Sequence, residues 1–221
     1  MLEEKITDLK KDLVVFATLI EQMIERCIKG LLEKKRDMLL DVLDDYEPKA
    51  NNYEISIEED CINLIAQFEP RAKDLRLILM GSKMCSSLER MGDHAVNIAE
   101  SSLFLIERPP VKPFIDIPRM AEITLTMLRD TTTSFINEDS KLARNVCERD
   151  KLVDDLKDQL IRELVTYMTS DITTIERSLH LLRISGNLER IADLSTNICE
   201  GVIFATKGQV IKHHKMDNEV K

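Results

Sequence analysis

Apolar residues recur three and four positions apart along most of the 221-residue chain, and this spacing is typical of the buried face of an α-helix. Leu88, Met91, Ala95, Ile98 and Ala99 form one such series. Interruptions of the pattern divide the chain into six segments, each long enough for a helix of a bundle. The predicted helices are Leu2 to Glu33, Asp37 to Phe68, Lys73 to Ile106, Pro118 to Asn137, Ser140 to Thr169 and Asp171 to Lys207.

Four of the six prolines fall between Glu107 and Arg119, which makes this segment the predicted break between two halves. The breaks between the other helices are short, as antiparallel neighbours in a bundle require. We therefore expect an all-α protein made of two tandem three-helix bundles. The first comprises residues 1–111, and the second comprises residues 112–221 and ends in a polar tail.

An internal repeat relates the two halves, because the segment 88–100 returns as the segment 188–200. The positions that stay unchanged between the two copies are mainly polar, whereas the apolar positions vary. Packing alone would preserve the opposite set. The unchanged polar pairs are Glu89 and Glu189, Arg90 and Arg190, Asp93 and Asp193, Asn97 and Asn197, and Glu100 and Glu200.

The repeat places two carboxylates one helical turn apart in each half. Glu89 and Asp93 share one face of their helix, and so do Glu189 and Asp193. Like charges at this spacing destabilise a helix by about 0.2 to 0.5 kcal/mol per pair. A repeated pair of this kind suggests a bound cation.

The middle helix of each half carries a further oxygen-bearing pair. In the second half this pair is Asp150 and Asp154, and its counterpart 103 residues earlier is Glu47 and Asn51. If the middle and last helices form antiparallel hairpins with the turns predicted above, these pairs lie level with the acidic pairs of the last helices. Each bundle then holds four candidate metal ligands: Glu47, Asn51, Glu89 and Asp93 in the first, and Asp150, Asp154, Glu189 and Asp193 in the second.

Carboxylate and amide oxygens are hard ligands, and no thiolate or histidine pair accompanies them in this pattern. We expect a cluster of several metal ions in each bundle, with iron, manganese, magnesium or carboxylate-bound zinc as candidates. His94 follows Asp93 but points about 100° away from it on the helix.

The composition supports a helical protein, since 43% of the residues are hydrophobic, 4% are aromatic and only six are glycine. The net charge of −9 argues against a nucleic-acid partner. The five cysteines contain no Cys-x-x-Cys motif and indicate reduced thiols of a cytosolic protein. No run without a charged residue is longer than eight residues, the length of Leu13 to Ile20, which is too short for a membrane helix, and no export signal is visible.

Over nearly its whole length the chain resembles the PhoU family of phosphate-uptake regulators. The resemblance rests on the motifs Leu88 to Asp93 and Leu188 to Asp193, and on the segments 70–77, 148–154 and 207–213. It implies a symmetric six-helix fold with multinuclear iron or zinc clusters bound by acidic-x-x-x-Asp motifs. The ligands that it implies are Glu89, Asp93, Asp150, Asp154, Glu189 and Asp193, with Glu47 as a further candidate.

The chain departs from the family pattern in the first half. Where similar proteins have Asp or Asn after Val, this chain has Asn51 after Ala50. Pro48 lies in the same segment and is expected to interrupt its helix. The first cluster is therefore expected to be less complete than the second.

The resemblance also implies a role. Similar proteins act in the cytoplasm as negative regulators of phosphate uptake and of the phosphate-starvation response. They contact the ATPase of the phosphate-specific ABC transporter and a phosphate-sensing histidine kinase, and they reach the membrane only through such partners. The resemblance alone also implies a homodimer.

Two other classes of function remain open. A carboxylate-bridged di-metal oxidase would use Glu-x-x-His motifs, but none of the four histidines has an acidic residue three positions before it. The chain also has no His-Glu-x-x-His motif and no glycine-rich phosphate loop, so an enzyme is not expected. A metal-free helical scaffold that regulates a different transporter is the second alternative, and the metal content would distinguish it.

Overall fold

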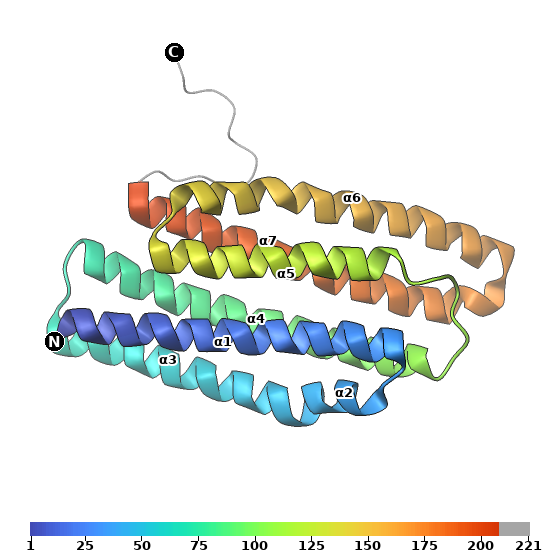
Figure 1. Ribbon diagram of the computed structural model, residues 1–221, viewed down its shortest axis with the longest axis horizontal. Coiled ribbons are helices and arrows are strands. Elements are labelled where there is room, and N and C mark those ends of the chain that lie inside the picture. Colours follow the sequence, from blue (N-terminus) through green and yellow to red (C-terminus); the bar gives the residue numbers. More distant parts are fainter. Residues whose placement is uncertain (208–221) are drawn as a thin grey trace, which may run out of the picture.

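The computed structural model describes residues 1–207, so the predicted polar tail, residues 208–221, lies outside the described residues. Helices account for all the regular structure of the described part (Figure 1). In chain order they are α1 (Leu2–Glu33), α2 (Arg36–Asp41), a π-helical turn (Val42–Tyr46), α3 (Glu47–Phe68), α4 (Lys73–Ile106), α5 (Asp116–Asn137), α6 (Ser140–Ser170), a 3₁₀ turn (Ile172–Thr174) and α7 (Ile175–Lys207).

The six predicted helices and the all-α fold are confirmed. Helices α1 and α4 begin and end where the apolar pattern predicts. Helix α5 begins two residues earlier than predicted, because Pro118 lies in its first turn, where the backbone N–H groups have no partner within the helix. The connection between α4 and α5, which contains the predicted boundary between residues 111 and 112, has no regular structure.

The expected interruption at Pro48 takes the form of a π-helical turn directly before the proline, and not of a break in the helical chain. The chain remains helical from α2 through the π-helical turn into α3, and Pro48 lies in the first turn of α3. A proline inside an α-helix lacks a donor and clashes with the carbonyl group four residues earlier. Here the N–H of Glu47 donates to the carbonyl oxygen of Val42, five residues earlier, so the wider turn accommodates the proline.

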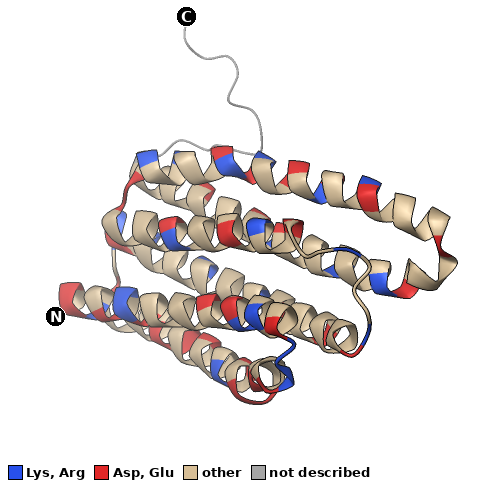
Figure 2. Ribbon diagram, turned by 45° about the vertical axis from the view of Figure 1, so that its right-hand side comes forward, with Lys and Arg blue, Asp and Glu red and all other residues tan. Residues whose placement is uncertain are grey.

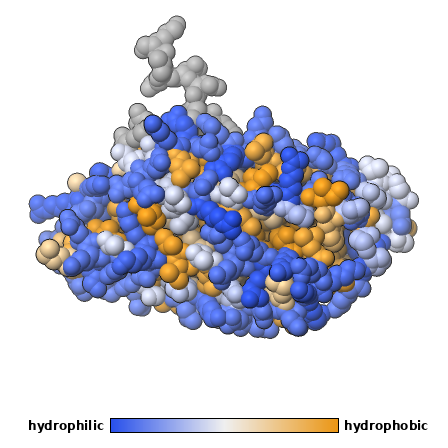
Figure 3. Space-filling view, viewed as in Figure 1, coloured by the Kyte–Doolittle hydropathy of each residue, from blue (hydrophilic) through white to orange (hydrophobic). Residues whose placement is uncertain are grey.

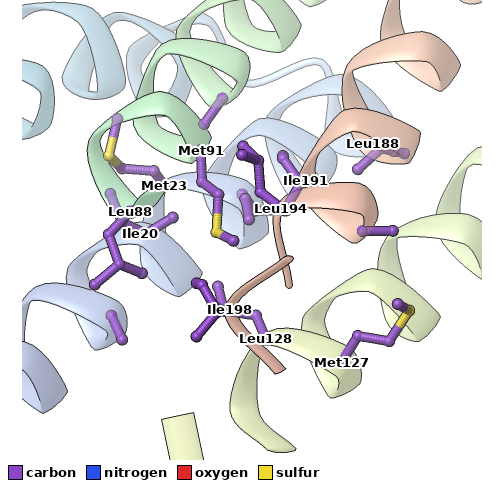
Figure 4. Close-up of a cluster of buried hydrophobic side chains, with 14 of the residues drawn as sticks. Ile20, Met23, Leu88, Met91, Met127, Leu128, Leu188, Ile191, Leu194 and Ile198 are labelled. Atoms are coloured by element: carbon purple, nitrogen blue, oxygen red, sulfur yellow. The ribbon is translucent and has the colours of Figure 1, made fainter. Parts of the chain in front are cut away.

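The two halves share one hydrophobic core. Helices α1, α3 and α4 form the first bundle, helices α5, α6 and α7 form the second, and α4 packs along α7 between them (Figure 1). Figure 4 shows side chains of both halves in one cluster, among them Met91 from α4, Leu128 from α5 and Ile198 from α7. The face seen in Figure 3 is mainly polar, with groups of exposed apolar side chains between the polar ones.

An ion-pair group joins the halves at one end of the molecule. The carboxylate of Glu138, just after α5, lies 2.9 Å from Nζ of Lys73 and 3.5 Å from Nζ of Lys10. The hydrogen bond from Lys73 holds the pKa of Glu138 below its usual value, and the charge of Lys10 adds to this effect. The group therefore stabilises the fold only while Glu138 is ionised.

We expect the substitution Glu138→Gln to lower the free energy of unfolding by up to about 1 kcal/mol at pH 7, because the pair is partly exposed. A carboxyl group whose pKa is lowered in the folded state stabilises the protein above its unfolded pKa of about 4.5. This stabilisation is lost as the pH falls through the folded pKa. The difference between wild type and variant should therefore be smaller at pH 3 than at pH 7 in urea titrations. The exposed Glu148→Gln is the control, and an equal difference at both pH values would contradict the prediction.

Candidate metal centre

Four carboxylates meet on the second bundle, where α6 and α7 run antiparallel. Asp150 and Asp154 lie on α6, and Glu189 and Asp193 lie on α7. Burial, followed by the charges of Asp154 and Asp193, raises the pKa of Asp150 to about 6. Burial also raises the pKa of Asp154, followed by the charges of Glu189 and Asp193. The structure therefore brings together all four residues that the repeat predicts for this bundle, and we call them the second cluster.

Unpaired oxygen atoms distinguish the second cluster from an ordinary acidic surface. Acidic residues occur on all the helices (Figure 2), but most of them are exposed. Asp150 is only 7% exposed, and its Oδ1 atom has no hydrogen-bond partner within the described part of the chain. The buried Oε2 atom of Glu189 also lacks one there. A buried carboxylate oxygen without a partner is unfavourable, and a cation would compensate it.

Two basic residues contact the second cluster. Nζ of Lys157 lies 3.1 Å from Oε1 of Glu189, and the side chain of Lys157 is 29% exposed. The guanidinium of Arg190 lies 3.1 Å from Asp193, but its side chain is largely exposed. An exposed ion pair of this kind contributes little to the stability of the fold. Lys157 is therefore the main internal counter-charge of this cluster.

The first bundle forms a smaller acidic group on α3 and α4, which we call the first cluster: Glu54, Glu89 and Asp93. Burial raises the pKa of Glu89, and the charges of Asp93 and Glu54 raise it further. Burial likewise raises the pKa of Glu54, together with the charges of Glu58 and Asp93. These shifts show that Glu54 lies close to the two acids of α4.

The structure does not place the other two predicted residues of the first bundle in this group. The side chain of Asn51 is exposed, and that of Glu47 is half-buried. Neither is among the groups that shift the pKa of Glu89. On α3, Glu54 is therefore the carboxylate beside Glu89 and Asp93, and metal binding by Glu47 and Asn51 stays a prediction.

The register of the first hairpin agrees with the prediction, so a shifted register is not the cause. Helix α3 ends at Phe68 and α4 begins at Lys73, on either side of the predicted turn. The thiol of Cys85 donates to the carbonyl oxygen of Glu54, which places Glu54 beside α4 one turn before Glu89. Side chains lean toward the N-terminus of their own helix. On the antiparallel α3, this lean carries the Glu54 carboxylate toward Glu89. In the sequence, the acidic pair Glu54 and Glu58, four residues apart, was the signal that could have indicated a carboxylate of α3 beside Glu89.

The oxygen atoms of the two clusters are of a chemical type that binds metal ions, but they are not already arranged around a common point. Within residues 1–207, no three Asp, Glu, His or Cys side chains are arranged to hold one ion. Both clusters nevertheless consist of hard oxygen donors on neighbouring helices, and the second has buried oxygens without partners. Carboxylates of the second cluster would have to rotate toward a common point to bind an ion.

Histidine and cysteine side chains are engaged elsewhere. Nδ1 of His94 lies 2.8 Å from Oδ1 of Asn187, so this ring joins α4 to α7. All five cysteines are free, as predicted for reduced thiols, and four of them are buried. Burial raises the pKa of Cys85 to about 12 and that of Cys61 to about 11, so neither is a thiolate at neutral pH.

Among the described helices, none combines the length and the apolar character needed to cross a bilayer.

Known proteins resemble this chain in both sequence and structure. A sequence profile described as "PhoU domain" matches residues 13–102 and again residues 117–202. The "Phosphate-specific transport system accessory protein PhoU homolog" of Aquifex aeolicus is 38% identical over 210 residues, which cover 95% of each chain. The protein named "Phosphate-specific transport system accessory protein PhoU" of Escherichia coli is 29% identical over 209 residues, 95% of this chain and 86% of that one.

Solved structures agree with these sequence matches. The crystal structure of PhoU from Pseudomonas aeruginosa has a TM-score of 0.90 at 30% identity, and the match covers 95% of this chain and 100% of that chain. The phosphate transport system regulatory protein PhoU from Streptococcus pneumoniae has a TM-score of 0.88 at 25% identity, over 96% of this chain and 100% of that chain. With a domain profile that matches both halves and relatives that cover almost the whole chain, this protein belongs to the PhoU family.

Proposed function

We propose that this protein is a cytoplasmic, metal-binding regulator of phosphate uptake that acts by protein contact. The observation that carries the proposal is the match of both halves to the PhoU domain. The names of the relatives describe accessory proteins of the phosphate-specific transport system. The partners that we propose are the ATPase of the phosphate-specific ABC transporter and a phosphate-sensing histidine kinase, which a homodimer of this chain contacts. The effect on uptake and on the phosphate-starvation response is negative.

Metal ions are proposed to bind at the two clusters, with iron or zinc foremost and manganese or magnesium as alternatives. In the second cluster the residues that would hold them are Asp150, Asp154, Glu189 and Asp193. When bound, the ions would link the carboxylates of α6 to those of α7 and neutralise their repulsion. The support is the buried, unpaired oxygen of Asp150 together with the hard-donor composition of the group.

Catalysis is not part of the proposal. His94, the histidine next to a cluster, uses Nδ1 to contact Asn187 and has no acidic residue three positions before it. The di-metal oxidase alternative makes a distinct prediction, which is oxygen consumption by the iron-loaded protein in the presence of a reductant. Absence of turnover under these conditions would exclude it.

Deletion of the gene tests the regulatory role. In cells grown with ample phosphate, we expect deletion to raise phosphate uptake and to induce phosphate-responsive transcription, because the negative regulator is lost. Radiolabelled phosphate uptake and a transcriptional reporter measure both effects, and complementation with the intact gene is the control. Unchanged uptake and transcription would contradict the proposed role, and a metal-free scaffold of another transporter would then be the better description.

Elemental analysis tests the metal sites directly. Protein purified without chelators should carry bound iron, zinc or manganese, and the double variant Asp150→Asn/Asp193→Asn should lose most of the metal of the second cluster. The exposed pair Glu148→Gln/Asp155→Asn on the same helix removes the same charge and should leave the metal content unchanged. Equal metal content in all three proteins would contradict metal binding at the second cluster.

A further inference from the structure

The two clusters carry charges of opposite sign at one structurally equivalent position. When α6 is aligned with α3 at an offset of 103 residues, the buried positions of the two helices coincide. We therefore take residues that are 103 positions apart as equivalent. Val153 corresponds to Ala50 and Leu160 to Ile57, and all four residues are buried. The same offset relates Lys157 of the second cluster to Glu54 of the first.

Both residues act on the equivalent glutamate of the last helix. The carboxylate of Glu54 raises the pKa of Glu89, whereas the ammonium of Lys157 lies 3.1 Å from Glu189. Arg90 and Arg190 are present in both halves and therefore do not distinguish them. A single position thus adds a negative charge to the first cluster and a positive charge to the second.

We propose that Lys157 is an internal cation of the second cluster, which competes with metal ions for Glu189 and lowers the affinity of this cluster for them. The inference rests on the proposed metal-binding function. An ammonium group hydrogen-bonded to Glu189 uses an oxygen that a metal ion would otherwise bind, and its charge repels a second cation nearby. Metal binding at the second cluster therefore requires the ammonium to leave.

The surroundings of Lys157 allow this exchange. Its side chain is 29% exposed, and the long lysine stem can carry the ammonium into solvent. The ammonium also leaves the cluster incompletely compensated, because Oδ1 of Asp150 and Oε2 of Glu189 have no hydrogen-bond partner within the described residues, and Oε2 has only the exposed guanidinium of Arg190 at 3.8 Å. A divalent ion held by these carboxylates would replace one weak counter-charge with a stronger one.

Titration with Mn²⁺ tests the inference in a background that lacks the first cluster, Glu89→Gln/Asp93→Asn. We expect Lys157→Met to increase the affinity of the second cluster for Mn²⁺ by roughly tenfold or more, because a positive charge next to the site is removed. Lys157→Arg keeps the charge and should leave the affinity within about threefold. Lys141→Met removes the same charge about 24 Å away along α6 and should have no effect. Isothermal titration calorimetry measures all four proteins.

A reciprocal variant tests the equivalence of the two positions. In the background Asp150→Asn/Asp193→Asn, the substitution Glu54→Lys should weaken Mn²⁺ binding to the first cluster by roughly tenfold or more. Glu59→Lys, at an exposed position of α3, makes the same change in net charge and is the control. Equal affinities for Glu54→Lys and Glu59→Lys would overturn the assigned equivalence.

Thermal unfolding of the metal-free proteins supplies a readout that does not depend on metal. Lys157→Met should lower Tm by roughly 2 to 4 °C relative to Lys157→Arg, because the carboxylates lose their counter-charge. If Mn²⁺ binds to the second cluster but Lys157→Met changes neither affinity nor Tm, the inference on Lys157 is wrong and the proposed function stands. If no protein of the set binds Mn²⁺, Fe²⁺ or Zn²⁺ at either cluster, both are wrong.

Discussion

Replacing Asp150 with asparagine should make the metal-free protein more stable by about 3 kcal/mol at pH 7.5. The side chain is 7% exposed, and burial together with the charges of Asp154 and Asp193 raises its pKa to about 6. A shift of about two pKa units costs about 3 kcal/mol when the folded protein must keep this carboxylate ionised. Asparagine has a similar shape without the charge, so the cost disappears.

The dependence on pH and on metal identifies this effect. A raised folded pKa gives no penalty below the unfolded value near 3.8, and the penalty grows from there until it is complete above about pH 6. In urea titrations with a chelator, the stabilities of wild type and Asp150→Asn should therefore be similar near pH 4 and differ fully above pH 6. Added Zn²⁺ or Mn²⁺ should stabilise wild type more than the variant. Asp155→Asn, an exposed neighbour, is the control, and a variant less stable than wild type at pH 7.5 would contradict the prediction.

Replacing Lys112 with methionine should lower the free energy of unfolding by about 3 kcal/mol. The ammonium of Lys112, in the connection before α5, contacts the carboxylates of Asp116 and Glu163, and its side chain is 7% exposed. Burial by itself lowers the pKa of Lys112, but the hydrogen bonds to both carboxylates outweigh this effect and raise the pKa. Removing the lysine leaves Asp116 buried and without its cation, which is the costly way to break a buried pair.

The same group allows a decisive control. The triple variant Lys112→Met/Asp116→Asn/Glu163→Gln removes all three charges and should recover much of the lost stability, because no unpaired charge remains buried. The exposed Lys141→Met should change stability by less than about 0.5 kcal/mol. Urea denaturation monitored by circular dichroism measures each variant. A triple variant as unstable as Lys112→Met would show that packing of the lysine stem, and not the ion pairs, stabilises this connection.

The fold could be predicted because its signals are local. The apolar spacing of three and four residues shows where helices α1 and α4 lie, and breaks in this spacing mark their ends. The internal repeat predicts that the second half repeats the first. The segment around Pro48 is different, because whether a proline breaks a helix or is absorbed by a π-helical turn depends on packing at both ends of that turn.

The second cluster was also predictable, since Asp150 and Asp193 lie level across a hairpin whose turn is marked in the sequence. The first cluster was predicted less well. Glu54 contributes its carboxylate because its side chain leans along α3 toward Glu89. The lean displaces the carboxylate by about one helical turn, and pairing residues at equal height across the hairpin does not take this displacement into account. The same lean brings Lys157 to Glu189.

By itself the sequence determined the six helices, the duplication, the family and the acidic character of two equivalent sites, because each of these depends on the order and spacing of residues along one helix. Only the tertiary structure decided which charges face each other: that Glu54 joins the first cluster, that Lys157 lies in the second, and that Asp150 is buried with an unpaired oxygen. Contacts between helices depend on side-chain direction and on burial by the neighbouring bundle, and neither is encoded in spacing along one helix.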